Sequence, residues 1–112
     1  MEMQMTELGN AARVALVGRL DTSGVDRIET RFTASVVPLG RNTAVDLSGV
    51  TFVSSMGLRM LIGTARSLNL KKAKLVLFGA QPLVKESLDH ASLGEVIPIV
   101  ADETQALALL NA

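Results

Sequence analysis

The spacing of hydrophobic residues switches along the chain between a period of two, typical of strands, and a period near 3.6, typical of helices. Residues 1–6 alternate methionine with polar residues, and residues 13–20 form a second, largely apolar stretch after Leu8-Gly9-Asn10. These two stretches are expected to form an antiparallel hairpin, with its turn at residues 8–10. The methionines would then pack on the core. Alternatively, they form an apolar edge for a partner.

Helical spacing first occurs after residue 20, where Val25, Ile28, Phe32 and Val36 fall on one face. This pattern predicts a helix that begins near Asp21 and ends before Pro38, because proline cannot continue the hydrogen-bond ladder.

The middle of the chain repeats this order of strand and helix. Residues 44–53 predict a strand, and a helix follows from the serine pair at 54 and 55. The apolar positions expected on its inner face are Leu58, Leu61, Ile62, Ala65 and Leu68. Residues 73–78 form a nearly continuous apolar run, as a strand covered on both faces requires.

The last part of the chain predicts a helix, a short strand and a final helix. Gly79–Pro82 opens the first helix, and Val84 and Leu88 supply its inner face. Residues 96–100 predict a strand at a sheet edge, because Pro98 cannot donate a ladder hydrogen bond. A helix begins at residues 102–104, with Ala106, Leu107 and Leu110 facing inward.

The order β-β-α-β-α-β-α-β-α predicts an α/β fold with a mostly parallel sheet, an N-terminal antiparallel strand and about four helices. A chain of 112 residues is long enough for one hydrophobic core, so residues 1–112 are expected to form a single domain.

Composition excludes several classes of function. Eleven basic residues balance eleven acidic ones, without a cationic run, which argues against nucleic-acid binding. The chain has no cysteine, so it has neither disulfides nor a thiolate metal site. It lacks a secretory signal pattern and an apolar run long enough to cross a bilayer. We therefore expect a cytoplasmic protein that does not insert into membranes.

The sequence offers no catalytic constellation. His90 is the single histidine, and Val53 stands where a hydrolase motif Gly-x-Ser-x-Gly around Ser55 would need its first glycine. Asp46 could be the acceptor of a phospho-receiver domain, but the strand that ends at Leu20 adds only Asp21 for the magnesium ion. We expect neither enzymatic activity nor a bound cofactor or metal.

Two helix starts carry polar residues that have more than one possible role. Ser54 or Ser55 stands at an N-cap position, where backbone N–H groups and the helix dipole also favour an anion. A serine there is either a cap or a site for phosphate. Asp21 is similarly either the N-cap of the helix that begins there or a polar contact on the rim of the loop that leads to Ser54 and Ser55.

Two stretches, Gly18–Asp21 and Val45–Leu58, resemble the signatures of STAS domains, and more narrowly those of bacterial anti-sigma factor antagonists. The family pattern at the helix start is Asp-Ser-Ser/Thr-Gly, preceded by an aromatic and an aliphatic residue. Phe52, Val53, Ser55 and Gly57 match it. Ser54 replaces the aspartate and Met56 replaces the second hydroxyl residue.

The resemblance implies that Ser55 is phosphorylated, with Ser54 as the alternative acceptor. The implied partners are an anti-sigma factor that acts as an ATP-dependent serine kinase, and a metal-dependent serine phosphatase that reverses the modification. The residues expected to contact the partner are Asp21, Thr22, Ser54, Ser55, Met56, Gly57, Arg59 and Met60. For Met60, core filling is the competing interpretation.

The two departures from the pattern keep a second function open. In this alternative the chain is a non-phosphorylated STAS subunit, acting as a structural or regulatory module of a larger assembly such as a transporter.

Overall fold

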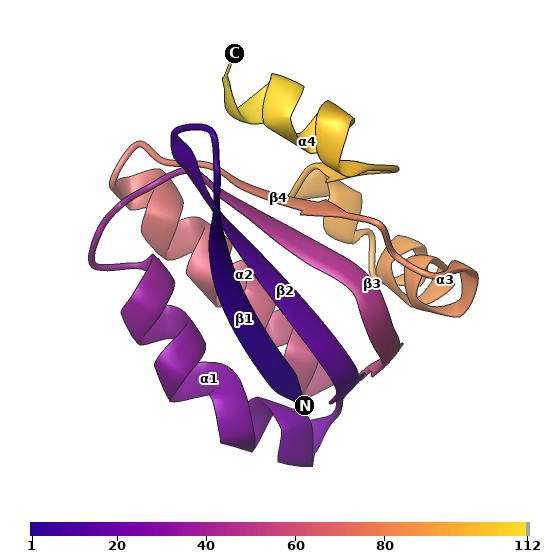
Figure 1. Ribbon diagram of the computed structural model, residues 1–112. Coiled ribbons are helices and arrows are strands. Elements are labelled where there is room, and N and C mark those ends of the chain that lie inside the picture. Colours follow the sequence, from indigo (N-terminus) through magenta and orange to yellow (C-terminus); the bar gives the residue numbers. More distant parts are fainter. Residues whose placement is uncertain (112) are drawn as a thin grey trace.

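Alternating side chains give the central sheet two apolar faces, and helices pack on both of them (Figure 1). The computed structural model describes residues 1–111. Its elements are β1 (Glu2–Leu8), β2 (Ala11–Leu20), α1 (Thr22–Val36), β3 (Thr43–Val53), α2 (Ser55–Leu70), β4 (Leu75–Phe78), α3 (Pro82–His90), a 3₁₀ turn (Leu93–Glu95), β5 (Ile99–Val100) and α4 (Glu103–Leu110).

The five strands are ordered β1-β2-β3-β4-β5 across the sheet. β1 pairs with β2 in an antiparallel hairpin, and every later neighbouring pair is parallel. The predicted fold class and order of elements are confirmed. The predicted domain, residues 1–112, includes one residue that lies outside the described range.

The main core lies between the sheet and helices α1, α2 and α3. Val45 and Leu47 of β3 point into it, whereas Ala44, the residue before Val45, faces α4. The smaller cluster beneath α4 consists of Ala11, Ala44, Val76, Phe78, Ala106 and Leu110. α4 therefore covers the sheet face opposite the main core.

The N-terminal methionines belong to the fold rather than to a free apolar edge. Met3 is buried in the main core, and Met1 and Met5 pack against it. The turn at Gly9 and Asn10 joins β1 to β2, as predicted.

Two strands are shorter than predicted. β4 begins at Leu75 rather than at residue 73. β5 is reduced to Ile99 and Val100, because the N–H groups of Val96 and Ile97 bond back to the Leu93 carbonyl of the preceding 3₁₀ turn rather than to β4. β5 pairs with β4 alone, so the prediction of an edge strand is correct. In α4, Ala106 and Leu110 are buried, while Leu107 is only half-buried.

Candidate functional site at the start of helix α2

The ends of β2 and β3 bring the starts of α1 and α2 to one edge of the sheet. The two strands are parallel neighbours, and Leu20 at the end of β2 pairs with Val53 at the end of β3. α1 and α2 each begin two residues later. The two sequence stretches that carry the family resemblance therefore meet in space.

Ser54 is the N-cap of α2 and also ties the helix to β2. Its Oγ accepts a hydrogen bond from the Gly57 N–H at 3.3 Å, and its hydroxyl donates to the Leu20 carbonyl oxygen at 3.1 Å. The Ser54 backbone N–H donates to the same carbonyl at 2.9 Å. The single hydroxyl hydrogen of Ser54 is thus committed to a structural contact.

Ser55 is the first residue of α2, and its side chain is exposed. Within residues 1–111 its hydroxyl makes no hydrogen bond to another group of the protein. The structure thus separates the two serines: Ser54 is the cap, and Ser55 presents a free hydroxyl to solvent.

Gly57 lets the first turn of α2 lie against the end of β2. A Cβ at this position would lie 2.7 Å from the Leu20 carbonyl oxygen and 2.8 Å from its Cγ. Gly24 has the same role at the start of α1, where a Cβ would lie 2.1 Å from the Arg19 carbonyl oxygen. Both helices can therefore approach β2 closely only because these residues are glycines.

Asp21 is the N-cap of α1, as one of the two sequence interpretations held. Its carboxylate accepts a hydrogen bond from the Gly24 N–H at 2.9 Å and pairs with Arg19 at 3.3 Å. The Gly24 hydrogen bond is the main cause that lowers the pKa of Asp21; burial opposes this effect, and Arg19 lowers the pKa further. Thr22 beside it is exposed at the first position of α1.

An apolar rim adjoins the serine pair. The Arg19 guanidinium lies 4.5 Å from the centre of the Phe52 ring, a cation–π contact between register neighbours of β2 and β3. Phe52 is 39% exposed and Met56 is 38% exposed. Sequence reasoning did not identify Arg19 as part of this surface, because its pairing with Phe52 depends on the register between β2 and β3.

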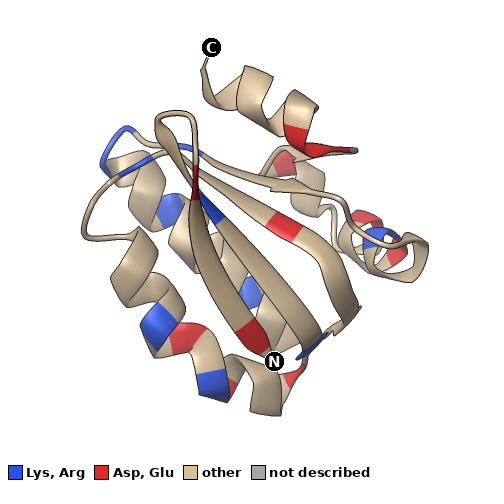
Figure 2. Cartoon of the chain, viewed as in Figure 1, with Lys and Arg blue, Asp and Glu red and all other residues tan. Residues whose placement is uncertain are grey.

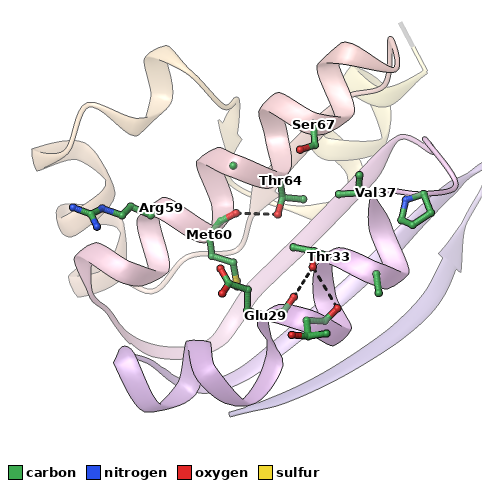
Figure 3. Close-up of a pocket in the computed structure, with 11 residues that line it drawn as sticks. Glu29, Thr33, Val37, Arg59, Met60, Thr64 and Ser67 are labelled. Carbon is green, nitrogen blue, oxygen red and sulfur yellow. Dashed lines mark hydrogen bonds between the residues drawn. The ribbon is translucent and has the colours of Figure 1, made fainter.

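Met60 is only 3% exposed and belongs to the main core, so the expectation that it offers an exposed contact is wrong. It lies between α2 and α1 and lines a groove of about 510 Å³ (Figure 3). Met56 and Arg59 on the same helix are exposed, so these two remain available to a partner.

Charge is distributed unevenly at this site, although the whole chain is neutral. No acidic residue occurs between Asp46 and Glu86, whereas α2 carries two arginines, Arg59 and Arg66 (Figure 2). Both arginines are exposed, and neither forms an ion pair with another residue in the described part of the chain.

Three other kinds of site were considered from the sequence: a phospho-receiver aspartate, a metal site and a membrane-spanning helix. Asp46, the candidate phospho-receiver residue, is ion-paired with Arg13 at 2.6 Å. Among residues 1–111, no group of three or more His, Cys, Asp or Glu residues is placed to hold a metal ion. No helix in that range has the length and hydropathy needed to cross a membrane.

A model of the STAS domain matches residues 2–106, which include every residue of the site described above. The chain belongs to the STAS domain family. The Bordetella bronchiseptica protein named putative anti-sigma factor antagonist BtrV is 24% identical over 108 residues, which cover 96% of this chain and 93% of BtrV.

Solved structures of other STAS proteins share this fold. An anti-sigma-factor antagonist (STAS) domain protein from Planctomyces limnophilus superposes with a TM-score of 0.86 at 19% identity, covering 98% of both chains. The Bacillus cell fate determinant SpoIIAA in its phosphorylated form gives a TM-score of 0.69 at 19% identity, with 96% of this STAS domain and 97% of SpoIIAA covered.

Proposed function

We propose that this STAS domain is an anti-sigma factor antagonist whose binding is switched off by phosphorylation of Ser55. In this proposal the start of α2 binds an anti-sigma factor that is also a serine kinase, and a metal-dependent serine phosphatase restores the binding form. The protein is then a cytoplasmic binding module without catalytic activity. The single observation that carries the proposal is the free, exposed hydroxyl of Ser55 at the edge where both signature stretches meet.

The choice of Ser55 over Ser54 rests on the hydrogen bonds of Ser54. Phosphate on the Ser54 oxygen would remove the hydrogen donated to Leu20 and place negative oxygens beside that carbonyl. It would also displace the cap of α2. A phosphate on Ser55 breaks no contact in the described structure, so the fold is expected to survive the modification.

A phosphate at this position is tolerated by the domain but not by an interface. It adds a charge of about −1.5 to −2 and three strong acceptor oxygens. The first turn of α2 partly compensates this charge, because unpaired N–H groups and the helix dipole are positive there. A partner packed over Ser55 must bury the charge or lose contacts, and a loss of about 3 kcal/mol lowers affinity roughly 100-fold.

The experiment combines phosphate mapping with binding. The purified protein and its Ser55→Ala variant are incubated with the candidate switch kinase and ATP, and phosphate is located by mass spectrometry. Phosphate is expected on Ser55 and on no residue of the variant. In calorimetric titrations with the kinase, Ser55→Ala should bind as tightly as the unmodified protein and Ser55→Asp about tenfold more weakly or worse, because aspartate carries only part of the phosphate charge.

The second candidate function is a non-switching STAS subunit of a larger assembly. It is favoured by one observation: Ser54 acts as a cap and replaces the aspartate of the family pattern. Absence of phosphate, with the kinase shown to be active on another substrate, and equal affinities of Ser55→Ala and Ser55→Asp would favour this candidate and contradict the first.

A further inference from the structure

Arg59 lies one helical turn beyond Ser55 on the exposed side of α2. Side chains four residues apart in a helix are neighbours, with Cβ atoms about 5–6 Å apart. Arg59 has no ion pair or hydrogen bond within residues 1–111. An unengaged cation therefore stands next to the free hydroxyl of Ser55.

The other charged groups that the structure describes around the site neither provide a second free cation beside Ser55 nor pair with Arg59. Arg19, the other arginine at this edge, is already engaged by Asp21 and by the Phe52 ring. Glu29 of α1 lines the same groove as Arg59 but forms no ion pair with it, and Figure 3 shows the Arg59 side chain directed away from Glu29. α2 itself contains no acidic residue that could hold Arg59.

We propose that Arg59 binds the phosphate group when Ser55 is phosphorylated, forming an ion pair within the first two turns of α2. The inference rests on the proposed function for the presence of a phosphate at Ser55. A guanidinium group matches two phosphate oxygens at once, which makes arginine a better partner for phosphate than lysine at a fixed site. The pair also has the favourable order, with the anion four residues N-terminal to the cation.

The pairing extends the effect of the modification beyond the serine. In the unmodified protein the Arg59 charge is free to contact an acidic group of a partner. In the phosphorylated protein the same guanidinium is occupied within the helix. One covalent change thus alters two adjacent positions of the surface.

Arg66 provides a matched control on the same helix. It is exposed and unpaired in the described part of the chain, as Arg59 is. Eleven residues separate it from Ser55, which brings it to nearly the same side of the helix but about 16 Å away. Replacing either arginine by glutamine changes the net charge equally, so a difference between the two variants reports proximity to the phosphate.

The experiment places phosphoserine at position 55 of the full chain during translation, so that no kinase is needed. The second ionisation of the phosphate is followed by ³¹P NMR as a function of pH in the parent protein and in Arg59→Gln, Arg59→Lys and Arg66→Gln. The free group titrates near pH 6, and a nearby guanidinium lowers this midpoint because it favours the dianion.

Arg59→Gln is expected to raise the midpoint by about 0.15–0.4 pH unit, which is the interaction strength of charge pairs at this spacing converted into a pH shift. Arg59→Lys should give a smaller rise, and Arg66→Gln should leave the midpoint unchanged. Equal shifts in the two glutamine variants, or none in Arg59→Gln, would overturn the proposal. Failure of a kinase to modify Ser55 would contradict the proposed function but would leave this titration unaffected.

Discussion

Gly57 shows how one missing side chain determines the position of the candidate site. Its Cα faces the Leu20 carbonyl so closely that any Cβ would overlap the carbonyl oxygen. The contact involves backbone on one side, so it cannot be relieved by a rotamer change alone. At Gly63, about two turns later on the same helix, the place that a Cβ would occupy is open instead.

Gly57→Ala is expected to lower the free energy of unfolding by about 2 kcal/mol, within the range typical of overpacking. Gly63→Ala should raise it by roughly 0.5–1 kcal/mol, because alanine is the better helix former and no atom lies within 4 Å of the added Cβ. Urea unfolding of the two variants measures both values. Equal effects would show that helix propensity, rather than the Leu20 contact, governs position 57.

Asp21 gives a pH dependence that can be tested with a conservative variant. Its pKa in the folded protein is lowered from 3.8, chiefly by the Gly24 N–H. A carboxyl group with a depressed folded pKa stabilises the fold at pH values above its unfolded pKa, and this contribution is lost as the pH falls through the folded pKa. Part of the stability is therefore expected to disappear below the unfolded value of 3.8.

Asp21→Asn keeps a side-chain oxygen for the cap but removes the titration. The unfolding free energy of this variant should fall less steeply than that of the parent protein as the pH is lowered below 3.8. Glu7, whose pKa is lowered mainly by its hydrogen bond with Arg41, titrates in both proteins and serves as an internal reference. Parallel stability curves would contradict the assignment of Asp21 as a titrating cap.

At the scale of elements, Arg13 joins three of them through its guanidinium group. Nη2 lies 2.6 Å from the Asp46 carboxylate on β3, and Nε lies 2.5 Å from Glu103 at the start of α4. The centre of the Phe78 ring on β4 lies 5.7 Å from the Arg13 Cζ atom. Asp46 is 9% exposed, and its second oxygen accepts the Ser48 N–H. Arg13 therefore pairs with a nearly buried carboxylate on β3 and with an exposed one on α4, and so ties strand to helix.

Arg13→Met retains much of the aliphatic stem but removes the guanidinium, and it should lower the free energy of unfolding by about 2 kcal/mol. Lys85→Met is the control, because the exposed Lys85–Asp89 pair on α3 contributes at most about 0.5 kcal/mol. Chemical denaturation of both variants provides the comparison. A loss for Arg13→Met no greater than for the control would contradict the bridging role.

The order of elements could be predicted because each strand and helix carries its own local hydrophobic period. The inner face of α2 could be predicted only in part: Leu61, Ala65 and Leu68 are buried, but Met60 and Thr64 replace Leu58 and Ile62 as fully buried positions. The side of α2 that carries Met60 packs towards α1, and this contact between two helices is not visible in the spacing of either one.

The candidate site shows the same division between local and non-local information. A cap at Ser54 or Ser55 could be predicted from sequence, since capping depends on nearby residues. The commitment of Ser54 to Leu20 could not, because the two residues are 34 positions apart. The neighbourhood of Arg19 and Phe52 depends on register shifts between β2 and β3, which no local pattern encodes.

At the scale of the whole molecule, the two faces of the sheet differ in how much apolar surface they bury. The main core holds three helices, whereas α4 rests on one small cluster. Two hydrogen bonds to backbone carbonyls of α4 also hold this helix in place. Asn42 Nδ2 donates to Leu110 at 2.9 Å, and Lys74 Nζ donates to Leu109 at 3.2 Å. α4 is therefore the helix with the weaker attachment.

This asymmetry predicts two cooperative units in native-state hydrogen exchange. Amides of α4 should exchange through a local opening that costs less free energy than opening α2, and Arg13→Met should lower the cost for α4 further. Amides in the middle of α2 should keep their protection throughout. Identical opening free energies for the two helices would show instead that the domain unfolds as one unit.

If α4 opens separately from the main core, its opening does not disturb the surface around Ser55 on the other side of the sheet. The Ser54–Leu20 tie and the Gly57 contact lie with the main core, while α4 packs on the other side of the sheet. α4 could then detach and return many times in the lifetime of the native state without altering the geometry presented at Ser55. Substitutions under α4 would accordingly change the abundance of the protein, through proteolysis of the opened form, before they changed its affinity for a partner.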